Sequence, residues 1–250
     1  MQSAVRSAPQ GIVVMPELVA SGYCFRDTAE SRALAEPLDG PTTQCMRQLA
    51  SETGSTLVAS FAEAEGDRVF NTAVVVDPSG LLGTYRKVHL WGRESLHFTA
   101  GDAPPALINT RYGRLGIVIC YDLEFPEWTR MAALAGADLI CASVNWPLSE
   151  RPAGERPMEQ VTVQAAAAAS RVPIAVADRC ASERMNEPIG SDWLGGSLIV
   201  GAHGYPLTQP ALGRPALLSA DVDLSATHNK HWAPWNDAFK DRRPDLYQLA

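Results

Sequence analysis

Three side chains in this sequence, those of Cys120, Glu17 and Lys87, are of the types that nucleophilic catalysis uses. A cysteine nucleophile needs a group that moves its proton and donors placed where negative charge develops on the attacked oxygen. Taken one at a time, each residue has a simpler explanation, because most cysteines are inert core residues and most charged residues lie in solvent. Their shared position, at the ends of strand-like segments, favours the catalytic interpretation.

The segments before these residues are short and apolar, which predicts buried strands. Glu17 follows residues 11–15 (GIVVM), Lys87 ends a second strand-like run, and Cys120 ends residues 114–120 (RLGIVIC). Open α/β sheets gather their sites at the carboxyl ends of strands, so the three side chains are expected to converge. Cys120 also stands just before a predicted helix, where backbone N–H groups and the helix dipole favour an anionic thiolate.

The rest of the chain alternates between strand-like and helical segments. Further strands are predicted at residues 56–61, 74–76, 82–85, 138–144, 174–177 and 197–200. Helices are predicted at residues 41–53, 126–136 and 158–170. Pro and Gly between residues 77 and 80 supply the turn of a hairpin. This alternation favours one layered α/β domain over residues 1–250.

The composition excludes several classes of function. With 46% hydrophobic and 20% charged residues, the chain is expected to fold around a sizeable core. The net charge of −7 argues against nucleic acid as a partner, because phosphate binding draws on clustered Lys and Arg. No window resembles a signal peptide or a membrane span, so a cytoplasmic protein without a membrane partner is expected. The five cysteines include no Cys-x-x-Cys pair, which predicts mostly free thiols.

No cofactor is expected from the sequence. Neither a Gly-x-Ser-x-Gly motif nor a phosphate-binding Gly-rich loop occurs, which removes support for a serine hydrolase or a nucleotide-dependent enzyme. His228 and His231 have the spacing of metal ligands, but no carboxylate or cysteine cluster near them completes a site. We therefore assign no metal.

Three motifs, in the order in which they occur, resemble those of the carbon–nitrogen hydrolase or nitrilase superfamily. They are residues 16–23 (PELVASGY), 85–90 (YRKVHL) and 119–127 (ICYDLEFPE). The similarity extends through residues 145–147 (NWP), 193–197 (WLGGS) and 241–247 (DRRPDLY), so it covers nearly the whole chain. Three ordered motifs are far more specific than any one of them.

The resemblance implies an αββα sandwich with a Glu-Lys-Cys triad. By this analogy Glu17 is the general base, and Lys87 and the backbone N–H of Tyr121 bind the oxyanion. Cys120 would form a thioester, ammonia would leave, and water would complete the reaction. Glu94 stands where the family often carries a second glutamate that positions the substrate. The alternative for Glu94 is a solvated acid in a loop.

The residues next to the nucleophile bear on the substrate. Tyr121 and Asp122 follow the cysteine, whereas family members that act on nitriles usually carry Trp-Glu there, so the resemblance implies a small carboxamide. Tyr121, Asn145 and Trp146 are the expected substrate-binding residues, and the two aromatic rings would form apolar walls.

Alternative functions stay open at this point. An N-carbamoyl amide hydrolase would need cationic groups for a substrate carboxylate, which Arg130, Arg151 or Arg156 could supply. Nitrile hydrolysis is a further possibility within the family. A catalytically silent binding or scaffold homologue belongs to a different class, but it would have no need of all three triad residues.

The resemblance also implies two features of the whole molecule. Family members usually have a strand and most of a helix before the glutamate motif, whereas residues 2–8 can supply only the final turns of that helix. The hypothesis is that Met1 is internal to the natural protein, and the alternative is that the fold tolerates the loss. A homodimer or higher homo-oligomer is expected, with Trp232 and Trp235 adding aromatic surface near the C-terminus.

Overall fold

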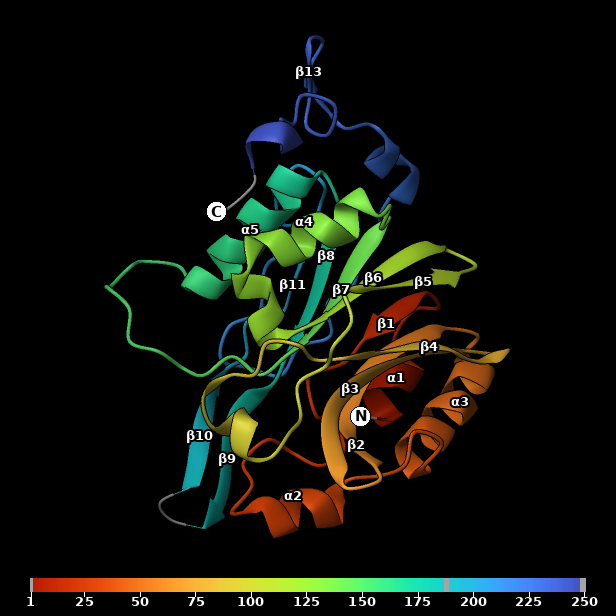
Figure 1. The fold of residues 1–250 in the computed structure, drawn as a ribbon, viewed down its shortest axis with the longest axis vertical. Coiled ribbons are helices and arrows are strands. Elements are labelled where there is room, and N and C mark those ends of the chain that lie inside the picture. Colours follow the sequence, from red (N-terminus) through yellow and green to blue (C-terminus); the bar gives the residue numbers. More distant parts are fainter. Residues whose placement is uncertain (1, 187–188, 248–250) are drawn as a thin grey trace.

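Two β-sheets lie face to face, and helices cover both outer faces, in a computed structural model that describes residues 2–186 and 189–247 (Figure 1). The first sheet has the strand order β1 (Ile12–Val14), β2 (Thr56–Glu65), β3 (Arg68–Asp77), β4 (Gly80–Arg86). The second has the order β11 (Leu198–Val200), β8 (Ile174–Asp178), β7 (Leu139–Val144), β6 (Gly113–Ile119), β5 (Ala106–Thr110). This is the αββα sandwich that the family resemblance implied.

The central strands of the second sheet are largely buried. β6, β7 and β8 pair in parallel, and every residue of β7 is buried. Such strands are near-continuous apolar runs, which is why the sequence predicts them well. The predicted hairpin is β3 and β4, which pair antiparallel, and both strands are longer than predicted. Its turn is held by Asp77, whose Oδ1 accepts from the Ser79 backbone N–H at 2.7 Å.

The main helices begin where the sequence predicts. α3 (Pro41–Thr53) and α5 (Met158–Ser170) have the predicted bounds, and α4 (Pro126–Leu134) begins at the predicted proline. Proline fits the first turn of a helix because its missing N–H has no partner there anyway. In Figure 1, α4 and α5 cover the five-stranded sheet, and α1 (Gln2–Ser7) and α3 cover the four-stranded one.

The first strand differs from its prediction. Residues 11–15 were expected to form a buried strand, but only Ile12–Val14 pair, and their side chains are partly exposed. The cause is the place of β1 at the edge of its sheet among the described residues. Helix α1 has six residues and packs its buried Val5 beside α3.

Several elements were not predicted, because they are short or rich in polar residues. They are α2 (Thr28–Leu34), β5, the hairpin β9 (Cys180–Asn186) and β10 (Ile189–Leu194), β12 (His231–Ala233), β13 (Asn236–Asp237), and the 3₁₀ helices η1 (Gly92–Leu96), η2 (Cys120–Glu124), η3 (Leu224–His228) and η4 (Pro244–Leu246). The β9–β10 hairpin extends away from the sandwich in Figure 1. Two of these elements, η1 and η2, carry catalytic candidates.

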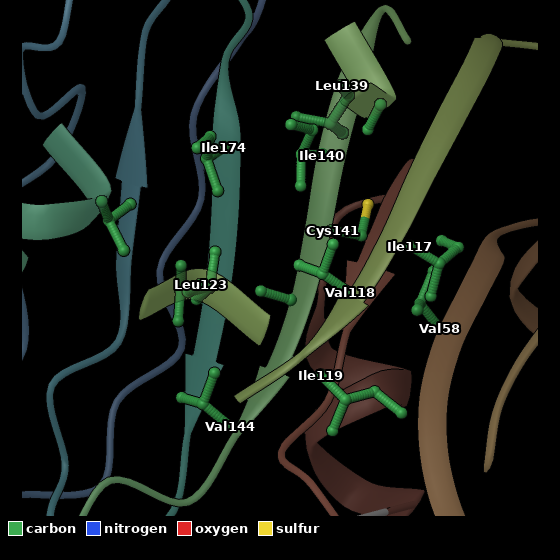
Figure 2. Packing of buried hydrophobic residues seen from close by; sticks show 14 of the residues in the cluster. Val58, Ile117, Val118, Ile119, Leu123, Leu139, Ile140, Cys141, Val144 and Ile174 are labelled. Atoms are coloured by element: carbon green, nitrogen blue, oxygen red, sulfur yellow. The ribbon is translucent and has the colours of Figure 1, made fainter. Parts of the chain in front are cut away.

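The main core lies between the two sheets and under α4 and α5. Val58 of β2 shares one buried cluster with Ile117 of β6, Ile140 of β7 and Ile174 of β8 (Figure 2). Burying a branched side chain contributes about 1.5–3 kcal/mol relative to leaving it in water. Because the interior is close-packed, these contacts fix the position of one sheet relative to the other. They therefore also fix the loops that carry Glu17, Lys87 and Cys120.

Candidate active site

The four predicted catalytic residues meet at one end of the sandwich. Lys87, directly after β4, donates from Nζ to Oε1 of Glu17 and to Oε1 of Glu94, both at 2.7 Å. Cys120 is the first residue after β6, and its charge state affects that of Lys87. Both sheets therefore contribute to the site, since Glu17 and Lys87 follow strands of one sheet and Cys120 follows a strand of the other.

The Glu17 carboxylate has one occupied and one open oxygen. Oε1 accepts from Lys87 Nζ and, at 2.7 Å, from Asn71 Nδ2 of β3. Oε2 is buried and has no hydrogen-bond partner among the described residues. Burial raises the pKa of Glu17 to about 7, although the Lys87 ammonium opposes the shift. Oε2 is therefore an acceptor poised to take a proton near neutral pH.

Lys87 is an ammonium in a fully buried position. Burial disfavours its charged form, but the carboxylates of Glu17 and Glu94 raise the pKa of Lys87 above its ordinary value. An ammonium has three N–H groups, and two of them donate to the carboxylates. The third is left to bind an oxyanion, since no other acceptor for Nζ lies within the described part of the chain.

Glu94, on η1, belongs to the site and is not a solvated loop acid. Only 4% of the residue is exposed. Besides Lys87, its Oε1 accepts from the Tyr23 hydroxyl at 2.6 Å, and its Oε2 accepts from the Trp91 backbone N–H at 2.9 Å. These bonds fix the carboxylate and, through it, the Lys87 ammonium.

The loop that carries Tyr23 depends on a glycine. Gly22 has φ +77°, a left-handed conformation, and a Cβ there would lie 2.4 Å from Oε1 of Glu183. That same oxygen accepts from the Tyr23 backbone N–H at 2.8 Å, so the carboxylate cannot move away freely. Gly22 belongs to the glutamate motif of the sequence analysis. Its backbone conformation and the closeness of Glu183 explain why glycine occupies this position.

Cys120 stands in a strained turn, and its thiol is buried. Its φ of +47° is rarely adopted by residues other than glycine and is typical of functional sites. Burial and the nearby Glu17 carboxylate raise the pKa of the thiol well above its ordinary value, against the opposing effects of Lys87 and the Asn145 backbone N–H. The expectation that a helix dipole stabilises a thiolate is therefore wrong. α4 begins only at Pro126, and η2 is a short 3₁₀ turn whose dipole is small.

Asp122 connects the nucleophile turn to the lysine segment. It is fully buried, and its Oδ2 accepts from the Ile119 backbone N–H at 2.9 Å and from the Tyr85 hydroxyl at 2.7 Å. Its Oδ1 lies 2.7 Å from Nδ1 of His89 and accepts from the His89 backbone N–H at 3.2 Å. Tyr85 and His89 flank Lys87 in sequence, so one carboxylate sets the position of Cys120 relative to Lys87.

Asn145 and Trp146 form a wall with unused donors. The Asp178 carboxylate accepts from the backbone N–H of Trp146 at 2.9 Å and of Gly196 at 2.7 Å. Arg179 Nε donates to Asn145 Oδ1 at 3.1 Å. The remaining donors, Asn145 Nδ2 and Trp146 Nε1, are buried and have no partner among the described residues. A polar ligand would satisfy them.

Two cavities meet at this wall and share Trp91, Asn145 and Pro147. The smaller, of about 300 Å³, is lined by Cys120 and by the predicted substrate-binding residues Tyr121, Asn145 and Trp146. The residues that line the larger cavity, of about 420 Å³, include Glu94. The Tyr121 ring packs edge-on against Trp91, with ring centroids 4.8 Å apart, and closes one side of the smaller cavity.

The three arginines considered for binding a substrate carboxylate lie elsewhere. Arg130, Arg151 and Arg156 line neither cavity. Arg130 donates to backbone carbonyls, at 2.6 Å for Ala169, and Arg156 donates to the Gln164 side chain. These arginines therefore give no support to binding of a carboxylate next to Cys120.

The sequence missed the residues that support the triad. Asn71 binds Glu17 across 54 positions of sequence, and Glu183 binds Tyr23 across 160. Asn71 carries one signal, since it is a polar residue inside the buried strand β3. Glu183 and Arg179 lie in and beside β9, a strand with no apolar pattern, and give no such signal.

Comparison with known proteins identifies the family. The carbon–nitrogen hydrolase family model matches residues 1–230. A nitrilase from Pyrococcus abyssi is 35% identical over 239 residues, which cover 94% of this chain and 86% of the relative. An N-carbamoylputrescine amidase from Solanum lycopersicum is 30% identical, with 98% of this chain and 86% of the relative covered.

Solved structures agree with the sequence comparisons. A carbon–nitrogen hydrolase from Helicobacter pylori has a TM-score of 0.85 at 27% identity, covering 98% of this chain and 88% of its own. A glutamate-to-glutamine variant of an amidase from Nesterenkonia has a TM-score of 0.76 at 26% identity, with 98% and 86% covered. Its active-site cysteine carries the covalently added acetamide moiety of fluoroacetamide. Family model, relatives and fold together show that this chain belongs to the carbon–nitrogen hydrolase family of the nitrilase superfamily.

Proposed function

We propose that the protein hydrolyses a small carboxamide to a carboxylate and ammonia through a thioester on Cys120. The observation that carries the proposal is the buried arrangement of Glu17, Lys87 and Glu94 beside a cavity lined by Cys120. It offers a proton acceptor, an oxyanion donor and a nucleophile in one place.

In the first half-reaction, the thiol of Cys120 attacks the carbonyl carbon and its proton passes to Oε2 of Glu17. The carbonyl oxygen becomes an oxyanion, which the third N–H of Lys87 and the backbone N–H of Tyr121 stabilise. The carbon–nitrogen bond then breaks. The leaving nitrogen takes the proton from Glu17 and departs as ammonia, which leaves the acyl group on sulfur.

In the second half-reaction, Glu17 takes a proton from water while the water oxygen attacks the thioester carbon. The carbon–sulfur bond breaks, the thiolate recovers its proton from Glu17, and the carboxylic acid leaves. Glu94 fixes Lys87 and borders the substrate. Asn145 Nδ2 and Trp146 Nε1 are donors for polar atoms of the substrate, because burial leaves them without other partners.

A carboxamide is favoured over a nitrile by the residues after the nucleophile. Tyr121 and Asp122 stand where family members that act on nitriles usually carry Trp-Glu. N-Carbamoyl amides share the attacked carbon–nitrogen bond and belong in the same screen.

We also propose that residues 1–250 act as one catalytic domain in the cytoplasm, within a homodimer or larger homo-oligomer. Cys45, Cys120, Cys141 and Cys180 carry free thiols, which suits a reducing compartment. Across the described residues, the helices are too short or too polar to cross a bilayer. Trp235 is 91% exposed and offers aromatic surface of the kind enriched at interfaces.

Substitution of the triad tests the mechanism. Cys120→Ala is expected to abolish ammonia release while the far-ultraviolet circular dichroism stays unchanged, because the thiol is the nucleophile. Lys87→Ala is expected to lower kcat about hundredfold or more, the scale of losing one oxyanion donor. The assay is ammonia release from small carboxamides, carbamoyl amides and the matching nitriles. Retained turnover in Cys120→Ala, or higher kcat/KM for the nitriles, contradicts the proposal.

The pH dependence tests the role of Glu17. A general base works only when ionised, so kcat/KM is expected to rise with pH, to bend at about pH 7 and to level off above it. Below the bend the rise should be about tenfold per pH unit. Asp178, whose pKa burial also raises to about 7, is the competing source of such a bend. The bend should persist in Asp178→Asn, and a profile that is flat from pH 5 to 8 is incompatible with Glu17 as the base.

Asp122→Asn tests the connection between nucleophile and lysine. The amide nitrogen replaces one acceptor oxygen, so a hydroxyl or N–H donor in this fully buried site loses its partner. The expected destabilisation is about 2–4 kcal/mol in urea unfolding, with a fall in kcat that exceeds the change in KM. Unchanged stability and kcat would show that Asp122 does not position the site.

The oligomeric state can be measured directly. Light scattering is expected to give at least twice the chain mass of 26.9 kDa. Trp235→Ser should shift the protein towards the monomer, whereas Leu246→Ser, at another exposed apolar residue, serves as the matched control. A monomer at micromolar concentration would refute the proposal.

A further inference from the structure

The cavity at Cys120 has an uneven charge distribution along its wall. Two of its lining residues, Glu124 and Glu159, carry carboxylates, and none of the described residues that line it is Lys, Arg or His. The larger cavity differs, because Arg93 and His97 line it. Apart from the buried Lys87 ammonium, which is held by Glu17 and Glu94, the described charges around this cavity are therefore negative.

The two carboxylates come from elements that pack against each other. Glu124 is the last residue of η2, four positions after the nucleophile, and Glu159 is in the first turn of α5. Burial, and then the charge of Glu159, raise the pKa of Glu124, so the two groups are close enough to repel each other. Neither has a basic partner within residues 2–186 and 189–247. The Glu124 side chain is buried in part but keeps exposed surface, and Glu159 is half-buried, so both residues lie where the cavity meets solvent.

The inner wall of the same cavity carries uncharged donors. Asn145 and Trp146 are 2% and 3% exposed, and their side-chain N–H groups have no partner among the described residues. Unpaired buried donors are rare in folded proteins, and both residues line this cavity, so a ligand with acceptor atoms on this side could satisfy them. The cavity is therefore built for a molecule that is polar and uncharged at one end and faces carboxylates at the other.

We propose that this cavity selects amides that carry a cationic group, and that Glu124 and Glu159 determine this specificity. The inference rests on the proposed amide hydrolysis. The amide carbonyl lies at the inner end, and an ammonium or guanidinium on the same molecule lies between the carboxylates at the mouth. A neutral amide of equal length lacks this attraction, and one that ends in a carboxylate is repelled.

Charged thiol reagents test the selection without any turnover. The Cys120 thiolate attacks the sulfur of the methanethiosulfonate that carries the charged or neutral side group. A disulfide forms between Cys120 and that group, and methanesulfinate leaves. Rates are measured for aminoethyl (cationic), methyl (neutral) and sulfonatoethyl (anionic) reagents by mass spectrometry of the peptide that contains Cys120. The cationic reagent is expected to react faster than the anionic one by a ratio that falls about tenfold or more in the Glu124→Gln/Glu159→Gln double variant.

Two controls make the labelling specific. Glu155→Gln removes the same charge from an exposed residue outside the cavity lining and should leave the rate ratio unchanged. Raising the salt concentration from about 20 mM to about 500 mM should lower the wild-type ratio, because exposed charges are screened. A ratio that is the same in wild type, double variant and high salt overturns the inference.

Turnover then separates this inference from the proposed function. Three primary carboxamides of equal chain length, ending in an ammonium, a methyl group or a carboxylate, are compared by kcat/KM. The cationic amide is expected to lead by about tenfold, mainly through KM, and to lose that lead in the double variant. Equal kcat/KM for all three overturns the specificity but leaves amide hydrolysis standing. Charge-selective labelling without turnover of any amide supports the selective cavity and refutes the proposed function.

Discussion

The active site depends on one buried ammonium held between two carboxylates. Transfer of an ion from water into a protein costs several kcal/mol even after relaxation, so Lys87, Glu17 and Glu94 can be buried only together. Tyr23 and Asn71 supply further donors, yet one oxygen, Oε2 of Glu17, has no partner in the described part of the chain. A purely structural ion cluster would have a partner for every buried oxygen. The unpaired Oε2 of Glu17 can instead accept a proton during the reaction.

The net charge of this cluster explains how the chemistry can proceed in a dry site. Two carboxylates and one ammonium sum to −1, and a thiolate at Cys120 would make −2, which burial opposes. When Glu17 takes the thiol proton as Cys120 attacks, the new negative charge appears on the oxyanion beside Lys87. The total stays at −1 throughout. Preorganised charges of this kind need no reorganisation during reaction, which is the main source of electrostatic catalysis.

The sequence predicted the parts of the molecule whose causes are local. Pro41 and the apolar face behind it gave α3 its observed bounds, and the ordered motifs identified Glu17, Lys87 and Cys120. The supporting contacts were not predictable, because they join residues far apart in the chain, as Glu183 and Tyr23 do. The protonated thiol was missed for a related reason. Its burial depends on both sheets, whereas the sequence offered only a nearby helix.

Charge selection at the mouth and protonation of the thiol act on the same group. Burial, together with the nearby Glu17 and Glu94 carboxylates, raises the pKa of the Cys120 thiol, and a thiol reacts with electrophiles more slowly than a thiolate does. A cation bound between Glu124 and Glu159 would bring positive charge into the cavity that Cys120 lines, and positive charge near a thiol lowers its pKa. By linkage, a ligand that favours the thiolate is itself bound more tightly when the thiolate forms. A cationic amide would therefore promote the ionisation that its own hydrolysis requires, while a neutral amide would meet a less reactive thiol.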